Sequence, residues 1–165
     1  GPMLGGDVPL ALPLFFVPLV LNAYLLTLLA LGARAGRFVP RAFSAITAVL
    51  AIDLVLDPAA VAIGFWSYVP PGGYYGVPAS NYWGWLLSGA IAVVLVDLAF
   101  YRAAVRERVR TCEFALDDLV SFVLLWGTIN ALYGPWLAAG VAGLFCLILL
   151  RTERYDLSIP SYGLL

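Results

Sequence analysis

Two aspartates, Asp53 and Asp57, lie four residues apart inside an apolar stretch, and Pro58 follows directly. Residues with this spacing lie one turn apart on the same face of a helix. Burial disfavours the charged form of a carboxyl group. When two carboxyl groups are close together, the charge on one further raises the pKa of the other. One member of such a pair can therefore stay protonated near neutral pH and donate a proton, while the other acts as a base.

Two other interpretations of the aspartate pair stay open. The carboxyl groups could fasten neighbouring helices through hydrogen bonds to Asn22, Asn81 or Asn130, because polar side chains stabilise helix bundles in membranes. The DxxxD spacing also resembles the magnesium-diphosphate motifs of membrane prenyltransferases. Those enzymes use a second acidic motif and cationic groups for the diphosphate, and the aspartates here are expected in the half of the protein that has no arginine.

The segment that follows the aspartates is uncharged and crowded with aromatic residues, glycines and prolines. Glycines permit tight turns and close approach. Aromatic faces attract cations, so acids beside aromatic walls suit chemistry that makes and tolerates a carbocation. For any single ring the alternative is an anchor at the membrane interface, where Trp and Tyr are enriched. The rings that we expect to line the site are Trp66, Tyr68, Tyr74, Tyr75, Trp83 and Trp85.

The composition predicts an integral membrane protein. Of 165 residues, 63% are hydrophobic and 12% are charged, whereas a soluble domain is about half apolar and a quarter charged. The net charge of -1 argues against nucleic acid as a partner. The chain has no histidine and no lysine, and its two cysteines are isolated. We therefore expect neither a metal site nor a Schiff base, and no cofactor. Gly1 and Pro2 are typical of a protease-cleavage scar, so one membrane domain is predicted over 3–165.

The fold class predicted is all-α, a polytopic bundle of about five transmembrane helices, because five apolar stretches approach the ~20 residues that a bilayer requires. Prolines 9, 13 and 18 are expected to bend the first span or delay its start. The Tyr133-Gly134-Pro135 break predicts a tight hairpin between the last two. The spans run from about Val8 to Leu31, Ala42 to Ile63, Tyr82 to Tyr101, Leu116 to Tyr133 and Trp136 to Leu150.

All nine cations are arginine, and they lie in alternate connections between these spans or after the last one. The other connections contain no charge. The positive-inside rule then places the amino terminus outside and the carboxyl terminus in the cytoplasm. The arginines are Arg34, Arg37 and Arg41, then Arg102, Arg106, Arg108 and Arg110, and finally Arg151 and Arg154.

This orientation places Asp53 near the middle of the second span and Asp57 about 6 Å further out, at 1.5 Å per residue. Pro58 cannot donate to the carbonyl of Leu54, so a kink and a free acceptor are expected there. The uncharged segment Gly64–Ser80 is predicted to be re-entrant or lid-like. Asp97 is expected to pair with an arginine, Arg102 or Arg34, in a structural role. Asp117 and Asp118 suit the start of the fourth helix.

Three strings in this region resemble the signature of the CruF-type carotenoid hydratases, the family of the bisanhydrobacterioruberin hydratases and γ-carotene 1'-hydroxylases. The match covers about a fifth of the chain closely, and its spacing of two acids, proline, GxW and YGxPxxNxxGW is specific. The strings are Asp53-Leu-Val-Leu-Asp57-Pro58 with Gly64-Phe65-Trp66, Gly73-Tyr74-Tyr75-Gly76-Val77-Pro78, and Asn81-Tyr82-Trp83-Gly84-Trp85.

The resemblance implies addition of water across the terminal C1–C2 double bond of an acyclic ψ end group, without metal, flavin or nucleotide. Asp53 or Asp57 would protonate C2, and the other carboxylate, with Asn81, would hold the attacking water. Rings such as Trp66 and Trp83 would stabilise the cation at C1. The implied partners are a long acyclic carotenoid, water and the lipid bilayer of a prokaryotic cell, together with other membrane enzymes of the carotenoid pathway.

Family members are longer and carry further helices before the first span here, so the resemblance implies a short member or one that lacks those helices. Two other functions also stay open. One is a non-catalytic carotenoid-binding or assembly subunit. The other is a carotenoid end-group cyclase, which also begins by protonating the alkene but excludes water.

Overall fold

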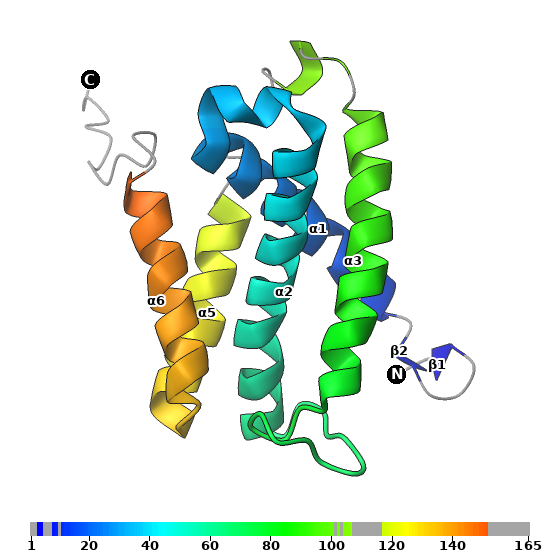
Figure 1. The fold of residues 1–165 in the computed structure, drawn as a ribbon. Helices are drawn as coiled ribbons and strands as arrows, with labels where there is room; N and C mark the ends of the chain where they lie inside the picture. Colours follow the sequence, from blue (N-terminus) through cyan, green and yellow to red (C-terminus); the bar gives the residue numbers. More distant parts are fainter. Residues whose placement is uncertain are drawn as a thin grey trace, which may run out of the picture.

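The computed structural model describes residues 3–4, 8–9, 11–100, 102, 104–106 and 117–151, with side chains from residue 15 onward. These residues are mostly helical (Figure 1), which confirms the all-α class. Two two-residue strands pair antiparallel before the first helix. The elements in order are β1 (Met3–Leu4), β2 (Val8–Pro9), α1 (Ala11–Leu31), the 3-10 helix η1 (Gly32–Gly36), α2 (Phe38–Ala62), α3 (Ala79–Ala99), α5 (Asp117–Tyr133) and α6 (Trp136–Arg151).

Each predicted span corresponds to one long helix, and the differences lie at the ends. The first helix begins after Pro9, three residues later than the predicted span, as the early prolines led us to expect. The second begins at Phe38, four residues earlier than predicted. Arg41 therefore lies in the first turns of α2 and not in the preceding connection. Pro40 does not prevent this, because the first turn of a helix needs no backbone donor from it.

Among the described residues, three helices are long and apolar enough to cross a membrane: Phe15–Gly36, Phe38–Ala62 and Ala79–Ala99. The other two long helices of the described chain are shorter, at 17 residues in α5 and 16 in α6. They form the expected hairpin, in which Gly134 takes a φ of 103° that other residues rarely adopt. The length and composition of the helices therefore support three membrane spans, and the total of five spans remains a prediction.

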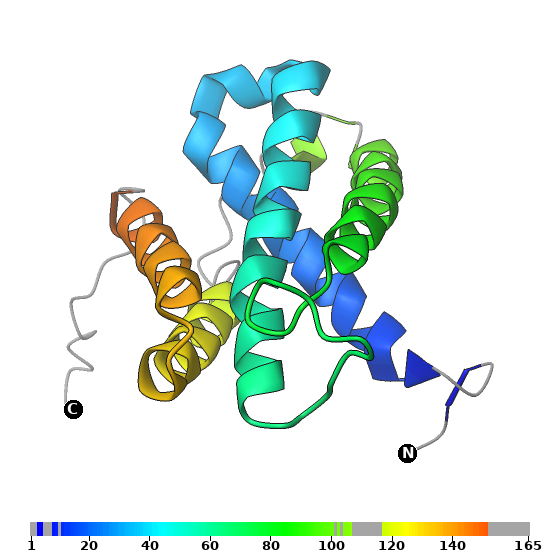
Figure 2. The same cartoon turned by 60° about the horizontal axis from the view of Figure 1, so that its bottom comes forward.

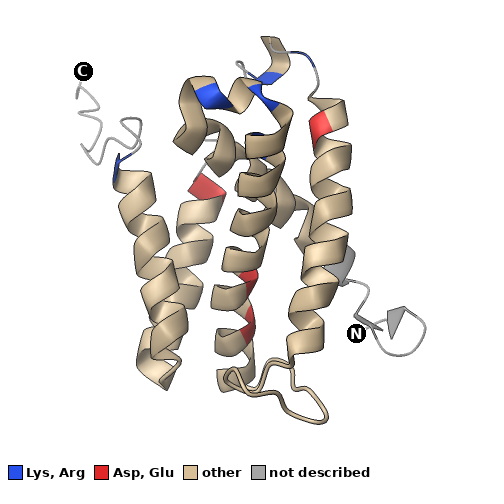
Figure 3. Cartoon of the chain, in the orientation of Figure 1, with Lys and Arg blue, Asp and Glu red and all other residues tan. Residues whose placement is uncertain are grey.

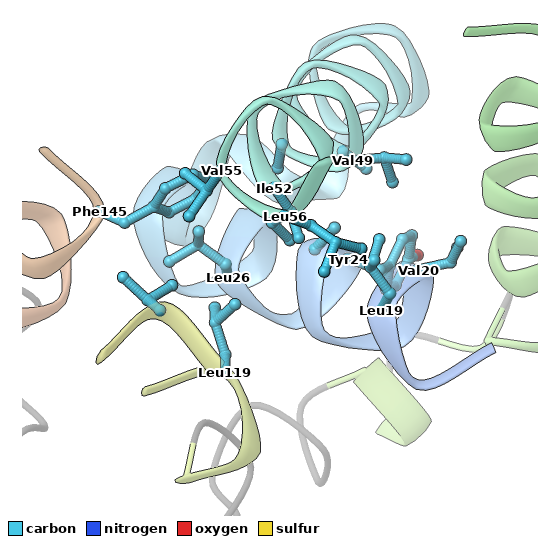
Figure 4. Close-up of a cluster of buried hydrophobic side chains, with 14 of the residues drawn as sticks. Leu19, Val20, Tyr24, Leu26, Val49, Ile52, Val55, Leu56, Leu119 and Phe145 are labelled. Atoms are coloured by element: carbon cyan, nitrogen blue, oxygen red, sulfur yellow. The ribbon is translucent and has the colours of Figure 1, made fainter. Parts of the chain in front are cut away.

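The central helix of the bundle is α2, which packs against α1, α3, α5 and α6. Figures 1 and 2 show α1 crossing it obliquely, with α3 on one side and the α5–α6 hairpin on the other. Apolar side chains from α1, α5 and α6 meet those of α2 (Figure 4). Small residues allow close approach: a Cβ added at Gly127 of α5 would lie 2.7 Å from Cβ of Ala142 of α6. The labelled core residues include Leu19, Leu26, Val55, Leu119 and Phe145.

Charge is distributed unevenly along the bundle (Figure 3). The arginines of the described residues gather toward one end, and the aspartates of α2 lie in the half nearer the loop between α2 and α3. This arrangement agrees with the predicted separation of aspartate pair and arginines. The direction in which the bundle crosses a membrane remains a prediction from the positive-inside rule.

Candidate active site

Asp53 and Asp57 lie on the face of α2 that meets the start of α3. Both are buried, with exposed fractions of 0% and 2%. The side-chain amide of Asn81, in the first turn of α3, donates to Oδ2 of Asp53 at 3.2 Å and to Oδ2 of Asp57 at 2.5 Å. One nitrogen thus bridges the two carboxyl groups. The expected shared face of the helix is confirmed, and Asn81 is their common partner.

The two carboxyl groups differ in their other contacts. The hydroxyl of Tyr68, in the loop between α2 and α3, donates to Oδ2 of Asp57 at 2.8 Å. Burial and the adjacent Asp57 carboxylate raise the pKa of Tyr68 well above its ordinary value, so the phenol stays protonated and remains a donor. Asp57 therefore accepts hydrogen bonds from two side chains on two different segments, and Asp53 accepts one.

The loop that carries Tyr68 is held by a compact turn over the end of α2 (Figure 2). The amide of Gly72 donates to the carbonyl of Gly76 at 2.9 Å, and the amide of Val77 donates to the carbonyl of Tyr74 at 2.9 Å. A Cβ added at Gly72 would lie 2.1 Å from the carbonyl oxygen of Val77, so only glycine fits there. This packing fixes the path of the segment between the ends of α2 and α3.

Tyr74 and Tyr75 attach the loop to the helices. The Tyr74 hydroxyl donates to the carbonyl of Leu54 at 3.4 Å, and the Tyr75 hydroxyl accepts from the amide of Leu137 at 3.2 Å. Leu54 is the residue whose carbonyl Pro58 leaves without its usual helical donor. The freed acceptor expected from the sequence therefore has a partner, and α2 continues through Pro58 to Ala62 as one helix.

Three polar atoms on α2, in the loop and on α3 are buried without a hydrogen-bond partner among the described residues. They are Oδ1 of Asp53, the indole nitrogen of Trp66 and the hydroxyl of Tyr82. Because most buried polar groups are paired, a polar ligand that reached any of these atoms would be stabilised. Tyr82 was not among the predicted site residues. Its signal in the sequence was its position next to Asn81.

Some of the predicted aromatic residues lie near the aspartates or the core, and others lie away from them. In the first group, the ring of Tyr74 meets that of Tyr82 edge to face, with centroids 6.0 Å apart. Trp66 is half-buried and packs against the apolar core. Trp83, in contrast, is 69% exposed, and Trp85 packs against Phe16 of α1 with centroids 5.2 Å apart. Within the described chain no hydrogen bond or ring contact joins Trp83 or Trp85 to the aspartates.

The two other asparagines considered as partners of the aspartates bind elsewhere. Asn22 of α1 donates to Oδ2 of Asp118 at 2.5 Å, and Asn130 of α5 donates to the carbonyl of Val55 at 2.7 Å. Of the three asparagines considered, only Asn81 therefore contacts the aspartate pair among the described residues, and the other two tie α1 and α2 to α5. Asp118 lies in the first turn of α5, as the sequence indicated.

Asp97 forms a second buried polar cluster toward the arginine-rich end. It makes a salt bridge to Arg41, with Nε and Oδ1 2.5 Å apart, and accepts from the hydroxyl of Tyr24 at 2.7 Å. Arg41 also donates to the carbonyl of Ala35. The partner predicted for Asp97 was Arg102 or Arg34. The ion pair is made by Arg41 because the early start of α2 places that arginine inside the bundle, opposite α3.

A cavity of about 140 Å³ lies between α1, α2 and α5. Its lining is mostly apolar, with rings from Phe15 and Phe122, and includes the Asn22–Asp118 pair. Neither aspartate of α2 lines it. Among the described residues no group of three or more His, Cys, Asp or Glu could hold a metal ion.

Apolar helices of membrane length around a buried pair of carboxyl groups define a helical membrane protein with a buried polar cluster. The chain belongs to the family of carotenoid biosynthesis proteins, whose family model matches residues 1–149. The resemblance found in the sequence is thereby confirmed.

The chain is also similar to a curated protein named bisanhydrobacterioruberin hydratase, from Haloarcula japonica. The two are 58% identical over 161 residues, which is 98% of this chain and 55% of that protein. The chain thus spans about half the length of this relative. No solved structure matches the chain.

Proposed function

We propose that this chain carries the site of a carotenoid hydratase, which adds water across the terminal C1–C2 double bond of an acyclic ψ end group. Family membership and the similarity to a protein named for a hydratase support the proposal. The observation that carries it is the buried pair Asp53 and Asp57, bridged by Asn81 and joined to the aromatic loop by the Tyr68 hydroxyl. Such a pair can supply one acid and one base side by side.

The reaction needs a proton at C2 and a hydroxyl group at C1. One carboxyl group donates its proton to C2, and the π electrons form the new C–H bond. The positive charge is left on the tertiary carbon C1, near the second carboxylate. A water molecule then forms a bond to C1 and loses a proton to that carboxylate. The sum is one alkene plus one water giving one tertiary alcohol, with no redox change.

The aromatic loop supplies the surroundings that this chemistry requires. Trp66, Tyr68 and Tyr74, with Tyr82 of α3, are proposed to surround the cation, since aromatic faces are attracted to positive charge. Trp83 is proposed as a lipid-facing anchor because it is largely exposed. The polyene would extend along the apolar helices in the lipid bilayer of a prokaryotic cell, and the bundle would cross five times with its arginine-rich end in the cytoplasm.

The proposal is tested by producing the chain in a host that makes lycopene and weighing the extracted pigments. A mass gain of one water per end group is expected. A ring formed without a change of mass would identify a cyclase. Pigment that co-purifies with the protein but keeps its mass and structure would identify a carotenoid-binding subunit. Either of these results would overturn the hydratase.

A further inference from the structure

We propose that the two aspartates have fixed and different roles: Asp53 is the proton donor, Asp57 is the carboxylate that accepts the proton from water, and Tyr68 holds Asp57 in that role. This assignment rests on the proposed hydratase function and names which residue of the pair does which step. It is carried by the difference between the hydrogen bonds that the two carboxyl groups accept.

Asp57 has the surroundings of an ionised carboxylate. Its Oδ2 accepts from the Tyr68 hydroxyl at 2.8 Å and from the Asn81 amide at 2.5 Å. Hydrogen bonds to the charged form favour ionisation, and those made to an ionised acceptor are stronger than neutral ones. The two donors come from the loop and from α3, so they also fix the direction of the carboxylate. A base that must orient one water molecule needs this rigidity.

Asp53 has the surroundings of a neutral carboxylic acid. It is completely buried, and the only donor to it among the described residues is Asn81, at 3.2 Å to Oδ2. Its Oδ1 has no partner within that part of the chain. A buried charge with only one donor is strongly disfavoured, whereas a protonated carboxyl group is far easier to bury. Since Asn81 contacts both groups, one carboxylate at Asp57 further disfavours a second at Asp53.

The assignment gives a role to two of the unpaired polar groups. Oδ1 of Asp53 is the oxygen left to carry the transferable proton. The buried hydroxyl of Tyr82 also lacks a partner within the described residues, and it lies within range of electrostatic interaction with Asp53 and Asp57. It can therefore bind the water that attacks C1.

Both aspartates return to their starting protonation states after one turnover. Asp53 loses its proton to C2, and Asp57 gains one from the water that attacks C1. A water molecule, the second substrate of the reaction, then carries the proton from Asp57 back to Asp53. The two carboxyl groups lie close together because both accept a hydrogen bond from the same Asn81 nitrogen.

The assignment is tested with membranes that contain the protein, an unlabelled acyclic carotenoid and buffer made in D₂O. Mass spectrometry follows two products: the hydrated carotenoid, and unreacted alkene that has gained deuterium. In Asp57→Asn the acid remains, so C2 is still deuterated. The cation then returns a hydrogen from C2 or an adjacent methyl group to the Asp53 carboxylate. We expect hydration to fall about 100-fold or more, while deuterium still enters the recovered alkene.

In Asp53→Asn the proton donor is removed, so both hydration and deuterium uptake should be lost. Asp53→Glu keeps an acid at this position and should regain measurable uptake, with all yields expressed per amount of inserted protein. Uptake in Asp53→Asn but not in Asp57→Asn would reverse the roles and overturn the assignment. Equal loss of uptake in both Asn variants, or no recovery with Glu, would also overturn it.

Tyr68→Phe tests the positioning role. Without its hydroxyl, Asp57 loses one of its two donors, and a hydrogen bond to a charged group is worth roughly tenfold or more in rate. Hydration should fall by about that factor while deuterium uptake falls less, so the ratio of uptake to hydration rises. Tyr133→Phe, at an exposed position on α5, is the matched control and should change neither.

Equal reduction of both products in Tyr68→Phe would mean that Tyr68 only supports the fold, and would overturn its positioning role. Failure of the unmodified protein to hydrate or to deuterate any carotenoid would instead overturn the proposed function itself. The two failures are therefore distinguishable in one set of measurements.

Discussion

Asn81 contacts both aspartates through a single amide nitrogen, so neither carboxyl group can change its charge without affecting the other. When residues act as a unit in catalysis, the effects of their substitutions on the rate are strongly non-additive. We expect Asp53→Asn combined with Asp57→Asn to hydrate scarcely less than the worse single variant. The measurement is hydrated pigment per inserted protein.

A structural pair would behave differently. Asn keeps the size and much of the hydrogen bonding of Asp, and polar contacts in membrane bundles are worth about 1 kcal/mol each. If the aspartates only fastened α2 to α3, each Asn variant would yield nearly normal amounts of hydrated carotenoid. That result would remove the acid–base mechanism and leave the interpretation as a helix contact.

A second residue-scale prediction separates a wall of the site from a membrane anchor. Trp66 is half-buried against the core, whereas Trp136 is 69% exposed at the start of α6. If Trp66 stabilises a cation by roughly 1–2 kcal/mol, Trp66→Leu should lower hydration about tenfold while the protein still inserts and binds pigment. Trp136→Leu should leave hydration nearly unchanged. Equal and mild effects would mean that both rings are interface anchors.

At the scale of one element, the loop between α2 and α3 places Tyr68 on Asp57, and its path depends on Gly72. A side chain there would collide with the Val77 carbonyl. Gly72→Ala is therefore expected to displace the loop and lower hydration by at least tenfold, with the amount of inserted protein little changed. Gly73→Ala is the matched control, since a Cβ there meets nothing within 4 Å. Equal activities of the two variants would show that the loop path does not matter for the reaction.

At the scale of the whole molecule, the Arg41–Asp97 pair joins α2 to α3, and the Tyr24 hydroxyl brings in α1. Removing one partner leaves an uncompensated buried charge, which costs about 3–5 kcal/mol. Arg41→Leu should therefore lower the thermal midpoint in detergent clearly. The double change Arg41→Met with Asp97→Leu should recover most of the loss, because no unpaired charge remains. A double variant as unstable as Arg41→Leu would argue against this account.

The orientation of the bundle is a further property of the whole molecule. Cysteines placed at Arg106 and at Gly73, with Cys112 and Cys146 replaced by Ser, should react with an impermeant reagent from opposite sides of the membrane. The cysteine at position 106 should be reached only from the cytoplasm. Labelling of both from one side would contradict the five-span arrangement and the depth assigned to the aspartates.

The amino-acid sequence by itself determined the helices, the shared face of Asp53 and Asp57, and the family. These features follow from local properties: apolar length, prolines and glycines at the breaks, and residues four apart on one helix. The acceptor left at Leu54 by Pro58 was predictable for the same reason, because a missing backbone donor is a local fact.

Only the tertiary structure decided which side chains meet. The resemblance named Asn81, but its contact with both aspartates was visible only once α3 was placed against α2. The partner of Asp97 changed because Arg41 lies inside α2. Trp66 and Trp83 both lie in sequence rich in aromatic residues and glycine. Yet Trp83 is exposed and Trp66 is half-buried. Such pairings depend on the rotation and approach of packed helices, which are set by many long-range contacts and not by the spacing of residues along one helix.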